Sequence, residues 1–342
     1  MLLLTISLLF AGCGKEPEPE QVKATGFEID ASKVLIADKS GCIQVDLIIE
    51  PNDAWPLDIY ISSDNNDVAT VTLGAIDEDG NAVFSSDIKK VKDDLEKEDP
   101  EAAEKVVVPT DTAIISAMGY GECTINATLD DLSDSTKVIV ADKRVALTFD
   151  DGSCAETAIL LEGLKEEDVK ATFFVTGQMS QRSDEHIDAL KQAIEDGHEI
   201  GNHTYNHKPD AATLKDELKK TDKLIKSVGG EETTITRPVR GVVNSGTMKC
   251  GKAIILWSRD TMDWKYRDEK KIKKSILKSK DGDIVLMHDL YETSRMGALN
   301  AIPELKEKGF YFVTVTEMLG DPTENVIYEN GEKGMLETQI LE

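Results

Sequence analysis

The sequence is short of positive charge and of cysteine, and each shortage excludes a class of function. It has 39 Lys and Arg residues but 65 Asp and Glu residues, which gives a formal net charge of −26 at pH 7. This charge argues against nucleic acid as a partner and against electrostatic attraction to an acidic polymer, so ligands must be recognised by local contacts. None of the five cysteines shows Cys-x-x-Cys spacing, which excludes a zinc site of that kind.

The chain of 342 residues is long enough for two domains, each with a core of its own. Between residues 22 and 141, strand-like runs lie between Gly, Asn, Asp and Pro turns, which predicts an all-β sandwich. The expected strands are Ile43–Ile49, Leu57–Ile61, Ala113–Ile115, Cys123–Leu129 and Lys137–Val140. A charged insertion over about residues 77–109 interrupts this domain, and Asp87–Lys105 within it could form a solvated helix.

Residues 142–322 change to alternating strands and helices, which predicts a barrel of parallel strands surrounded by helices. The expected strands are Ala171–Thr176, Ile254–Ser258, Ile284–His288 and Phe310–Val315. The expected helices are Ala155–Glu166, Glu185–Glu195, Ala212–Val228 and Lys270–Lys278. The last residues, 323–342, form an acidic tail that we expect to be loosely ordered.

Two adjacent carboxylates end an apolar, strand-like segment at the start of this second domain. The run Thr148-Phe149-Asp150-Asp151-Gly152 follows Val145-Ala146-Leu147. Side chains alternate along a strand, so neighbouring Asp residues inside it would push one charge into the core, whereas at a strand end before Gly both can face a cleft. One Asp can then bind a metal while the other transfers protons. Taken alone, the run is more typical of an acidic surface turn.

A pair of histidines further along the chain changes this interpretation. His203 and His207 are four residues apart, so on one helical turn they would project from the same face and could bind one ion. Neutral imidazole suits zinc, and two histidines with one carboxylate leave positions open for water and substrate, as in catalytic sites. A chance surface pair is the alternative, which the Asp-Asp run disfavours.

Five motifs occur in order in the second domain: Thr148–Gly152, His203–His207, Arg237–Gly241, Asp260–Trp264 and Leu286–Asp289. With them, residues 143 to about 320 resemble the polysaccharide deacetylases of carbohydrate esterase family 4, the NodB-homology domain. The resemblance implies a distorted, incompletely closed (β/α) barrel with its site at the C-terminal strand ends and a groove for a polymer.

The resemblance also implies roles for individual residues. Asp151, His203 and His207 correspond to the metal ligands. Zn²⁺ is the expected ion, and Co²⁺ or another divalent metal could replace it. Asp150 corresponds to the general base, and Arg237 to the arginine that pairs with this base and orients it.

His288 corresponds to the general acid, and Asp263 to the carboxylate that tunes it. Hydrolysis of an acetamide needs an activated water, charge stabilisation at the carbonyl oxygen and a proton for a poor amine leaving group. An acidic neighbour favours the imidazolium that delivers this proton. The predicted products are acetate and a free amino sugar. The residues expected to contact the substrate are Trp264, Leu286, Arg240 and Asp260.

The third motif departs from the family pattern, which is usually Arg-Pro-Pro-Tyr-Gly. Val239 replaces the second Pro and Arg240 replaces the Tyr. An arginine at this point resembles a subgroup that acts on muramic acid residues, so Arg240 could meet a substrate carboxylate such as a lactyl or peptide-stem group. A solvated arginine at a loop rim is an equal alternative. Ser153-Cys154 also follows Gly152 where Pro is common, which removes no catalytic group.

Three runs carry a second resemblance: Ile48–Pro51, Ile61–Val71 and Gly119–Ile125. They make the first domain similar to a bacterial Ig-like domain of group 2. In an Ig-like strand order, a cross-sheet disulfide between Cys42 and Cys123 is geometrically natural. Cys154 and Cys250 both lie near catalytic loops and could also pair.

The N-terminus is expected to be a leader rather than part of the fold. Met1–Ala11 is apolar but too short to span a bilayer as a helix. It runs into Phe10-Ala11-Gly12-Cys13, which resembles a bacterial lipoprotein cleavage box and implies lipidation of Cys13 at the outer face of the cell membrane. An ordinary cleaved signal is the alternative. Residues 1–21 would be leader and tether, with Lys15–Glu20 extended by its own charge.

The leading prediction is a surface-anchored, monomeric hydrolase that removes N-acetyl groups from N-acetylglucosamine or N-acetylmuramic acid residues of cell-wall peptidoglycan. Its Ig-like domain would act as a spacer. Deacetylation of another polymer, such as chitin oligomers, an exopolysaccharide or acetylated xylan, is the first alternative. An inactive wall-binding protein is the second. The complete set of predicted catalytic and metal-binding residues argues against it, because drift usually removes at least one.

Overall fold

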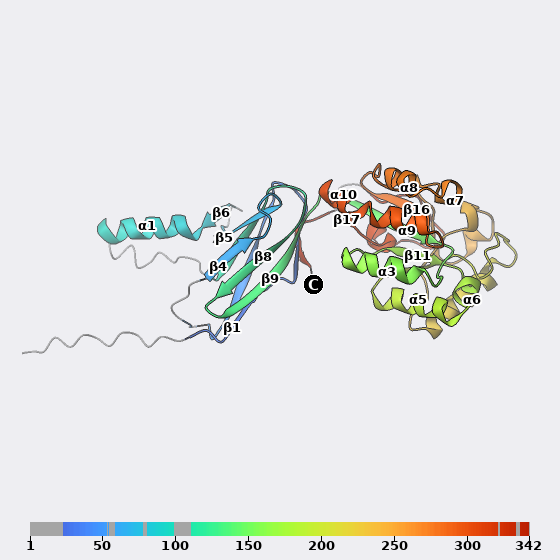
Figure 1. Cartoon of the computed structure of the whole chain (residues 1–342), viewed down its shortest axis with the longest axis horizontal. Coiled ribbons are helices and arrows are strands. Elements are labelled where there is room, and N and C mark those ends of the chain that lie inside the picture. Colours follow the sequence, from blue (N-terminus) through green and yellow to red (C-terminus); the bar gives the residue numbers. More distant parts are fainter. Residues whose placement is uncertain are drawn as a thin grey trace, which may run out of the picture.

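The computed structural model describes residues 23–52, 54, 59–77, 81–98, 111–320, 322–332 and 336–341. They form two domains that follow each other along the long axis of the molecule, one of β-strands and one of alternating strands and helices (Figure 1). The expected leader with Cys13 lies outside the described residues, as does part of the charged insertion. Within these ranges, no helix has the length and apolar character to span a membrane.

The first domain consists of two five-stranded sheets, in the strand orders β1-β3-β7-β5-β6 and β19-β2-β9-β8-β4. The strands are β1 Gly26–Ile29, β2 Lys33–Ile36, β3 Cys42–Glu50, β4 Ile59–Ser63, β5 Ala69–Ile76, β6 Ala82–Phe84, β7 Thr112–Ala117, β8 Gly121–Leu129, β9 Leu132–Val140 and β19 Gln339–Leu341. Alternate residues of both sheets, such as Val45, Ile115, Ile125 and Val138, share one core. The likeness to Ig-like domains stays a prediction.

The described cysteines are all free thiols: Cys42, Cys123, Cys154 and Cys250. Neither suggested disulfide is therefore present. Along β3, the alternate residues Val45 and Leu47 face the core, which places Cys42 on the outer face of its sheet. Cys123 of β8 is buried in the core between the sheets. The two thiols thus lie on opposite sides of the β3 sheet, so they cannot meet.

The charged insertion begins as a hairpin and continues as a helix. β5 and β6 pair antiparallel, and α1 follows directly as Ser85–Glu98. The helix therefore begins two residues before the expected Asp87–Lys105, whose last part lies outside the described residues. Figure 1 shows α1 projecting from the end of the first domain that is remote from the second.

The second domain is built on a curved sheet of parallel strands, in the order β15-β16-β10-β11-β12-β13-β14-β18, with β17 beside the start of β10. The strands are β10 Lys143–Asp150, β11 Thr172–Val175, β12 Glu199–Asn202, β13 Ile235–Thr236, β14 Ala253–Ile255, β15 Arg259–Asp260, β16 Asp283–His288, β17 Phe310–Phe312 and β18 Ile327–Tyr328. Only residues 256–258 separate β14, which lies next to β18 near one end of the sheet, from β15 at the other end. The predicted parallel, barrel-like fold agrees with this arrangement.

Helices cover the outside of the sheet (Figure 1), except that α11 packs Val315 and Met318 into the core on its inner face. They are α3 Thr157–Glu166, α4 Gly177–Ser180, α5 Asp184–Glu195, α6 Leu214–Ser227, α7 Asp263–Tyr266, α8 Glu269–Ile276, α9 Glu292–Leu299, α10 Ile302–Glu307 and α11 Val315–Leu319, with 3₁₀ turns η1 Val239–Gly241 and η2 Thr247–Lys249. Along β10, Leu147 and Phe149 pack against helices, whereas Ala146 packs in the core on the other face of the sheet. The same alternation turns Asp150 toward the inside of the barrel.

The C-terminal tail differs from the expected loose segment, because it adds a strand to each domain. β18 pairs with β14 of the barrel, and β19 pairs antiparallel with β2 of the first domain. Leu336 and Leu341 pack at the junction against a cluster that includes Leu35, Ile139 and Tyr311. The edges of both sheets offer unpaired backbone groups, which the tail satisfies.

The first domain docks at the N-terminal ends of the barrel strands, where β9 runs almost directly into β10. Lys33 and Lys137 contact Asp168, which lies just before β11, at 2.6 and 3.1 Å. Lys306 of α10 contacts Glu122 of β8 at 3.0 Å. The opposite, C-terminal ends of the barrel strands therefore face away from the first domain.

Candidate active site

A pocket of about 550 Å³ opens at the C-terminal ends of the barrel strands. It is lined by Asp150, Asp151, His203, His207, Arg240, Trp257, Asp260, Trp264, Leu286, His288 and Tyr291. The structure thus brings the predicted site residues of the barrel together. Two of them lie behind the pocket wall, Arg237 in contact with Asp150 and Asp263 in contact with His288.

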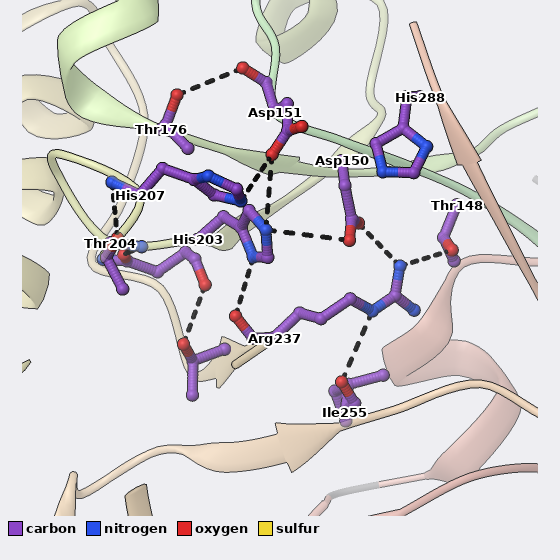
Figure 2. Close-up of polar contacts among 12 residues, drawn as sticks. Thr148, Asp150, Asp151, Thr176, His203, Thr204, His207, Arg237, Ile255 and His288 are labelled. Atoms are coloured by element: carbon purple, nitrogen blue, oxygen red, sulfur yellow. Dashed lines mark hydrogen bonds and ion pairs between the residues drawn. The ribbon is translucent and has the colours of Figure 1, made fainter. Parts of the chain in front are cut away.

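Asp150 is paired with a buried arginine. It is the last residue of β10 and is 3% exposed, and Arg237, just after β13, is fully buried. Nη1 of Arg237 donates to Oδ1 of Asp150 and to Oγ1 of Thr148, both at 2.7 Å, and its other nitrogens donate to backbone carbonyls at the end of β14 (Figure 2). The anchored guanidinium fixes the carboxylate. Oδ2 of Asp150 lies 3.8 Å from Nε2 of His203.

Asp151 reaches the same pocket because the chain turns where β10 ends. Its φ of 74° is left-handed, which is rare for a residue other than Gly. The Asp151 N–H donates to the carbonyl of Phe174, and the hydroxyl of Thr176 donates to the Asp151 carbonyl. Gly152 is required next, because a side chain there would collide with the buried carboxylate of Asp289. Consecutive carboxylates therefore face one pocket.

His203 and His207 lie on a loop after β12, so the predicted helical turn is wrong. Thr204 and His207 have left-handed φ values of 69° and 57°. Oδ1 of Asn202 accepts from the Thr204 N–H at 2.9 Å, and the Thr204 hydroxyl accepts from the His207 N–H at 3.1 Å (Figure 2). These side-chain bonds replace helical backbone bonds. They still bring the two imidazole centroids within 5.1 Å.

Asp151, His203 and His207 form a possible metal site, since their ligand atoms lie within 4.8 Å of one another. Oδ1 of Asp151 lies 3.4 and 3.1 Å from the two Nε2 atoms, is buried, and has no hydrogen-bond partner among the described residues. Nδ1 of His203 donates to the Arg237 carbonyl at 2.7 Å, which leaves Nε2 bare as a ligand. Burial lowers the pKa of His207, which favours the neutral form that binds metal. These donors fit a divalent ion with open positions.

His288 ends β16 and is paired with the fully buried Asp263. Its Nδ1 lies 2.9 Å from Oδ1 of Asp263, whose Oδ2 accepts from the His288 N–H at 2.7 Å and the Ser294 hydroxyl at 2.6 Å. Burial opposes the imidazolium, but the hydrogen bond and charge of Asp263 outweigh it and raise the pKa of His288 to about 9. His288 therefore carries a proton at neutral pH.

The four residues expected to contact the substrate all line the pocket. Leu286 of β16 is buried, and Trp264 of α7 is 48% exposed. Arg240 lies in η1 with a φ of 56°, and Asp260 ends β15. Their contacts with a substrate stay predictions.

Two lining residues were not predicted, Trp257 and Tyr291. Trp257 follows β14, with Gly241 packed close to its ring. The Tyr291 ring lies 5.9 Å from that of His288. Both had a signal in the sequence: Trp257 falls near the C-terminal end of an expected barrel strand, where such enzymes keep their sites, and Tyr291 follows the candidate acid by three residues.

The geometry defines a class of site. A carboxylate fixed by an arginine can accept a proton, a protonated histidine can donate one, and the Asp/His/His cluster can hold a divalent ion, all in one pocket. This combination suits metal-assisted hydrolysis at a carbonyl group.

Comparison with known proteins makes this class specific. A family model described as polysaccharide deacetylase matches residues 137–254. A peptidoglycan-N-acetylglucosamine deacetylase of Bacillus cereus is 37% identical over 193 residues, covering 52% of this chain and 89% of that protein. The chain belongs to the polysaccharide deacetylase family, whose members are metal-dependent hydrolases.

Other relatives are longer. Peptidoglycan-N-acetylglucosamine deacetylase PgdA of Listeria monocytogenes is 38% identical over 186 residues, and peptidoglycan-N-acetylmuramic acid deacetylase PdaC of Bacillus subtilis is 35% identical over 183. Each match covers 52% of this chain but only 39% and 38% of those proteins. A solved structure described as T48 deacetylase with substrate matches with a TM-score of 0.52 and 34% identity, over 55% of this chain and 96% of that one. The likeness thus concerns about half of this chain.

Proposed function

We propose that this protein is a metal-dependent hydrolase that removes N-acetyl groups from the amino sugars of cell-wall peptidoglycan and releases acetate. The observation that carries the proposal is the convergence of three units in one pocket: the Asp150–Arg237 pair, the Asp/His/His cluster and the His288–Asp263 pair. Amide hydrolysis needs a proton acceptor, activation of the carbonyl and the water, and a proton donor, and each unit supplies one of these.

The protein's own residues divide the proton transfers between them. Asp150 takes a proton from the attacking water, and Arg237 keeps its carboxylate in place. His288 gives its proton to the amide nitrogen as the C–N bond breaks, so that the sugar leaves as an amine. Asp263 keeps that proton on His288 until it is needed.

The metal supplies the remaining chemistry. Zn²⁺, or another divalent ion such as Co²⁺, would polarise the acetyl carbonyl and make water a better nucleophile when held by Asp151, His203 and His207. Two imidazole nitrogens and one carboxylate oxygen suit zinc. The hydrogen bond from His203 to the Arg237 carbonyl fixes its ring, with Nε2 left free to bind such an ion.

Peptidoglycan is the proposed substrate because of the relatives and of Arg240. The Listeria and Bacillus cereus relatives are named for N-acetylglucosamine and the Bacillus subtilis relative for N-acetylmuramic acid, so either sugar fits. Arg240 is exposed at the pocket, and no carboxylate of the described residues pairs with it. Its guanidinium can therefore bind a lactyl or peptide-stem carboxylate.

Acetate release from purified peptidoglycan, with mass spectrometry of the sugars, tests the proposal. We expect acetate when Zn²⁺ or Co²⁺ is present, loss of activity with a chelator, and recovery when metal is restored. The spectrum should show glucosamine or muramic acid without its acetyl group. Chitin oligomers and acetylated xylan serve as controls. Release from these controls alone would move the substrate to another polysaccharide, and no metal-dependent release from any glycan would refute the hydrolase.

We also propose where the enzyme works. The Phe10–Cys13 box supports lipidation of Cys13, which would hold a monomer at the outer face of the membrane with the first domain as an Ig-like spacer. A lipid on Cys13 in the mass spectrum, and release of the Cys13→Ser variant into the medium, are the expected results. A membrane-bound Cys13→Ser variant would contradict the anchor.

A further inference from the structure

The seven arginines of the chain all lie between residues 144 and 295, and they divide into two groups. Four are buried or half-buried and are held by carboxylates or backbone carbonyls: Arg144, Arg237, Arg259 and Arg295. The other three are exposed and have no ion pair with a carboxylate of the described residues: Arg182, Arg240 and Arg267, although Nε of Arg267 donates to the Trp264 carbonyl at 3.2 Å. In a chain with 65 acidic residues, exposed arginines without an acidic partner in the protein indicate a partner on a bound ligand.

These three exposed arginines lie at the catalytic pocket or beside residues that line it. Arg240 lines it, and Arg267 stacks on the ring of Tyr291, which lines it beside His288. Arg182 lines a second pocket of about 340 Å³, which shares His207 with the catalytic pocket. The second pocket thus adjoins the first at His207, one of the three residues of the possible metal site.

The second pocket has an aromatic wall that is fixed in place. Tyr205 lines it, and its hydroxyl donates to Oε1 of Gln181 at 3.0 Å. Gly177 packs so close to the Tyr205 ring that any side chain at this position would collide with it. The other lining groups are mostly polar or flexible and include Arg182 and Gln178. A fixed ring beside polar groups suits a sugar, which has one apolar face and many hydroxyls.

We propose that this second pocket binds the neighbouring sugar unit of the glycan chain and that Arg182 binds a carboxylate on that unit. The inference rests on the proposed function and deepens it, because it requires a polymer with carboxylates rather than a single acetylated sugar. Arginine binds carboxylates through two parallel hydrogen bonds, and Arg182 is exposed and unpaired. Because His207 lines both pockets, the unit held by Arg182 would lie next to the unit bound in the catalytic pocket.

The Arg182→Gln variant of the full chain tests this assignment. Its substrates are peptidoglycan fragments with lactyl carboxylates, with and without peptide stems, and neutral N-acetylglucosamine oligomers of equal length. We expect KM for the carboxylate-bearing fragments to rise about tenfold with kcat unchanged, and KM for the neutral oligomers to stay the same. Arg182→Lys, which keeps the charge but loses the paired geometry, should fall between.

Lys191→Gln is the matched control. Lys191 also carries an exposed positive charge, on α5, but pairs with Asp188 and lines neither pocket, so its KM values should not change. A rise in KM for all lactyl fragments assigns the lactyl carboxylate, and a rise only with stems assigns the peptide. An equal change on neutral and charged fragments, or no change, would overturn the inference. No acetate from the unsubstituted enzyme on either substrate would instead refute the proposed function on which it rests.

Discussion

Asp150 and Asp151 are consecutive in the chain but have different partners. Asp150 contacts Arg237 at 2.7 Å, whereas Oδ1 of Asp151 lies within 3.4 Å of two imidazole nitrogens and has no hydrogen-bond donor among the described residues. Each difference arises from one backbone position, the strand end for Asp150 and the left-handed turn for Asp151. Substitutions of these two residues should therefore impair the enzyme in different ways.

Asp151→Asn should lose metal and activity together, because it removes the only carboxylate of the Asp/His/His cluster. Asp150→Asn should keep one metal per chain and lose about 10² to 10⁴ in kcat, since a proton acceptor is gone. Metal content and acetate release, measured on the same samples, check both. The idea fails if Asp150→Asn loses its metal or if Asp151→Asn retains it. Because Asp150→Asn also leaves Arg237 without its partner, a thermal melt must show that the variant is folded.

The pH dependence should follow His288. Its pKa is raised above the ordinary value of 6.5 to about 9, so the proton needed by the leaving amine is lost only as pH rises toward 9. A bound cation opposes this charge, which places the alkaline limb of kcat/KM between these two values. Asp263→Asn removes the group that raises the pKa, so the limb should move to lower pH. An unchanged limb in that variant would show that another group controls it.

The same ion pair links stability to pH. The folded-state pKa of His288 lies above its unfolded value, so its contribution is fully present below pH 6.5 and is lost as pH rises through about 9. The contribution of this ion pair to the free energy of unfolding is on the order of 3 kcal/mol. Urea unfolding at pH 6 and pH 9.5 should show this loss in the unsubstituted chain and much less of it in Asp263→Asn.

The sequence predicted most pocket residues because five short motifs carry them, and each motif lies at, or directly after, the C-terminal end of a strand that faces the pocket. Trp257, Tyr291 and Arg182 were missed since they belong to no motif and reach the pockets through loops. A loop side chain can be placed only when the backbone around it is known. The arginines show this best, because their lack of acidic partners is visible only in three dimensions.

The turn from β10 into the following loop is the element on which the site depends. At its centre, Gly152 packs against the carboxylate of Asp289, which is fully buried and accepts the Thr157 hydroxyl at 2.5 Å. Burial raises the pKa of Asp289 to about 7. The packing leaves no room for a methyl group at position 152.

Gly152→Ala should therefore destabilise the protein by roughly 1 to 3 kcal/mol and weaken metal binding, because the turn that aims Asp151 must shift. Urea unfolding and a metal titration measure the two effects. In the double variant Gly152→Ala/Asp289→Ala the collision is removed, so the two stability losses should not add. Simple additivity would mean that the contact with Asp289 is not the cause.

At the scale of elements, prediction succeeded where hydrophobic periodicity was strong. β16 and α5 begin within one residue of the expected positions and end where expected. The segment of His203 and His207 was wrongly expected to be helical, because a spacing of four residues also fits a loop closed by side-chain hydrogen bonds. The tail strands were missed because they are two and three residues long and gain their stability from sheet edges made elsewhere.

At the scale of the whole molecule, the tail joins the two domains. Leu341 of β19 is partly buried against Leu35 and Ile139, whereas its neighbour Ile340 is 45% exposed. Leu341→Ser should cost about 1 to 2 kcal/mol, since it removes apolar contact at the junction. Ile340→Ser is the matched control and should change stability by less than about 0.5 kcal/mol. Thermal or urea unfolding compares them, and equal effects would show that the tail does not hold the junction.

The attachment of the first domain to the N-terminal ends of the barrel strands has a consequence for reach. Ion pairs, the short connection between β9 and β10, and the tail fix the two domains against each other. The pocket opens at the end of the second domain that faces away from the first domain, so the catalytic groups lie at one end of an elongated molecule. If the proposed lipid anchor holds Cys13 at a membrane, the pocket would lie at the end of the molecule away from the first domain that follows the anchor. The proposed substrate would then be reached at a distance from the membrane that depends on the length of the two domains together with that of the residues that precede them.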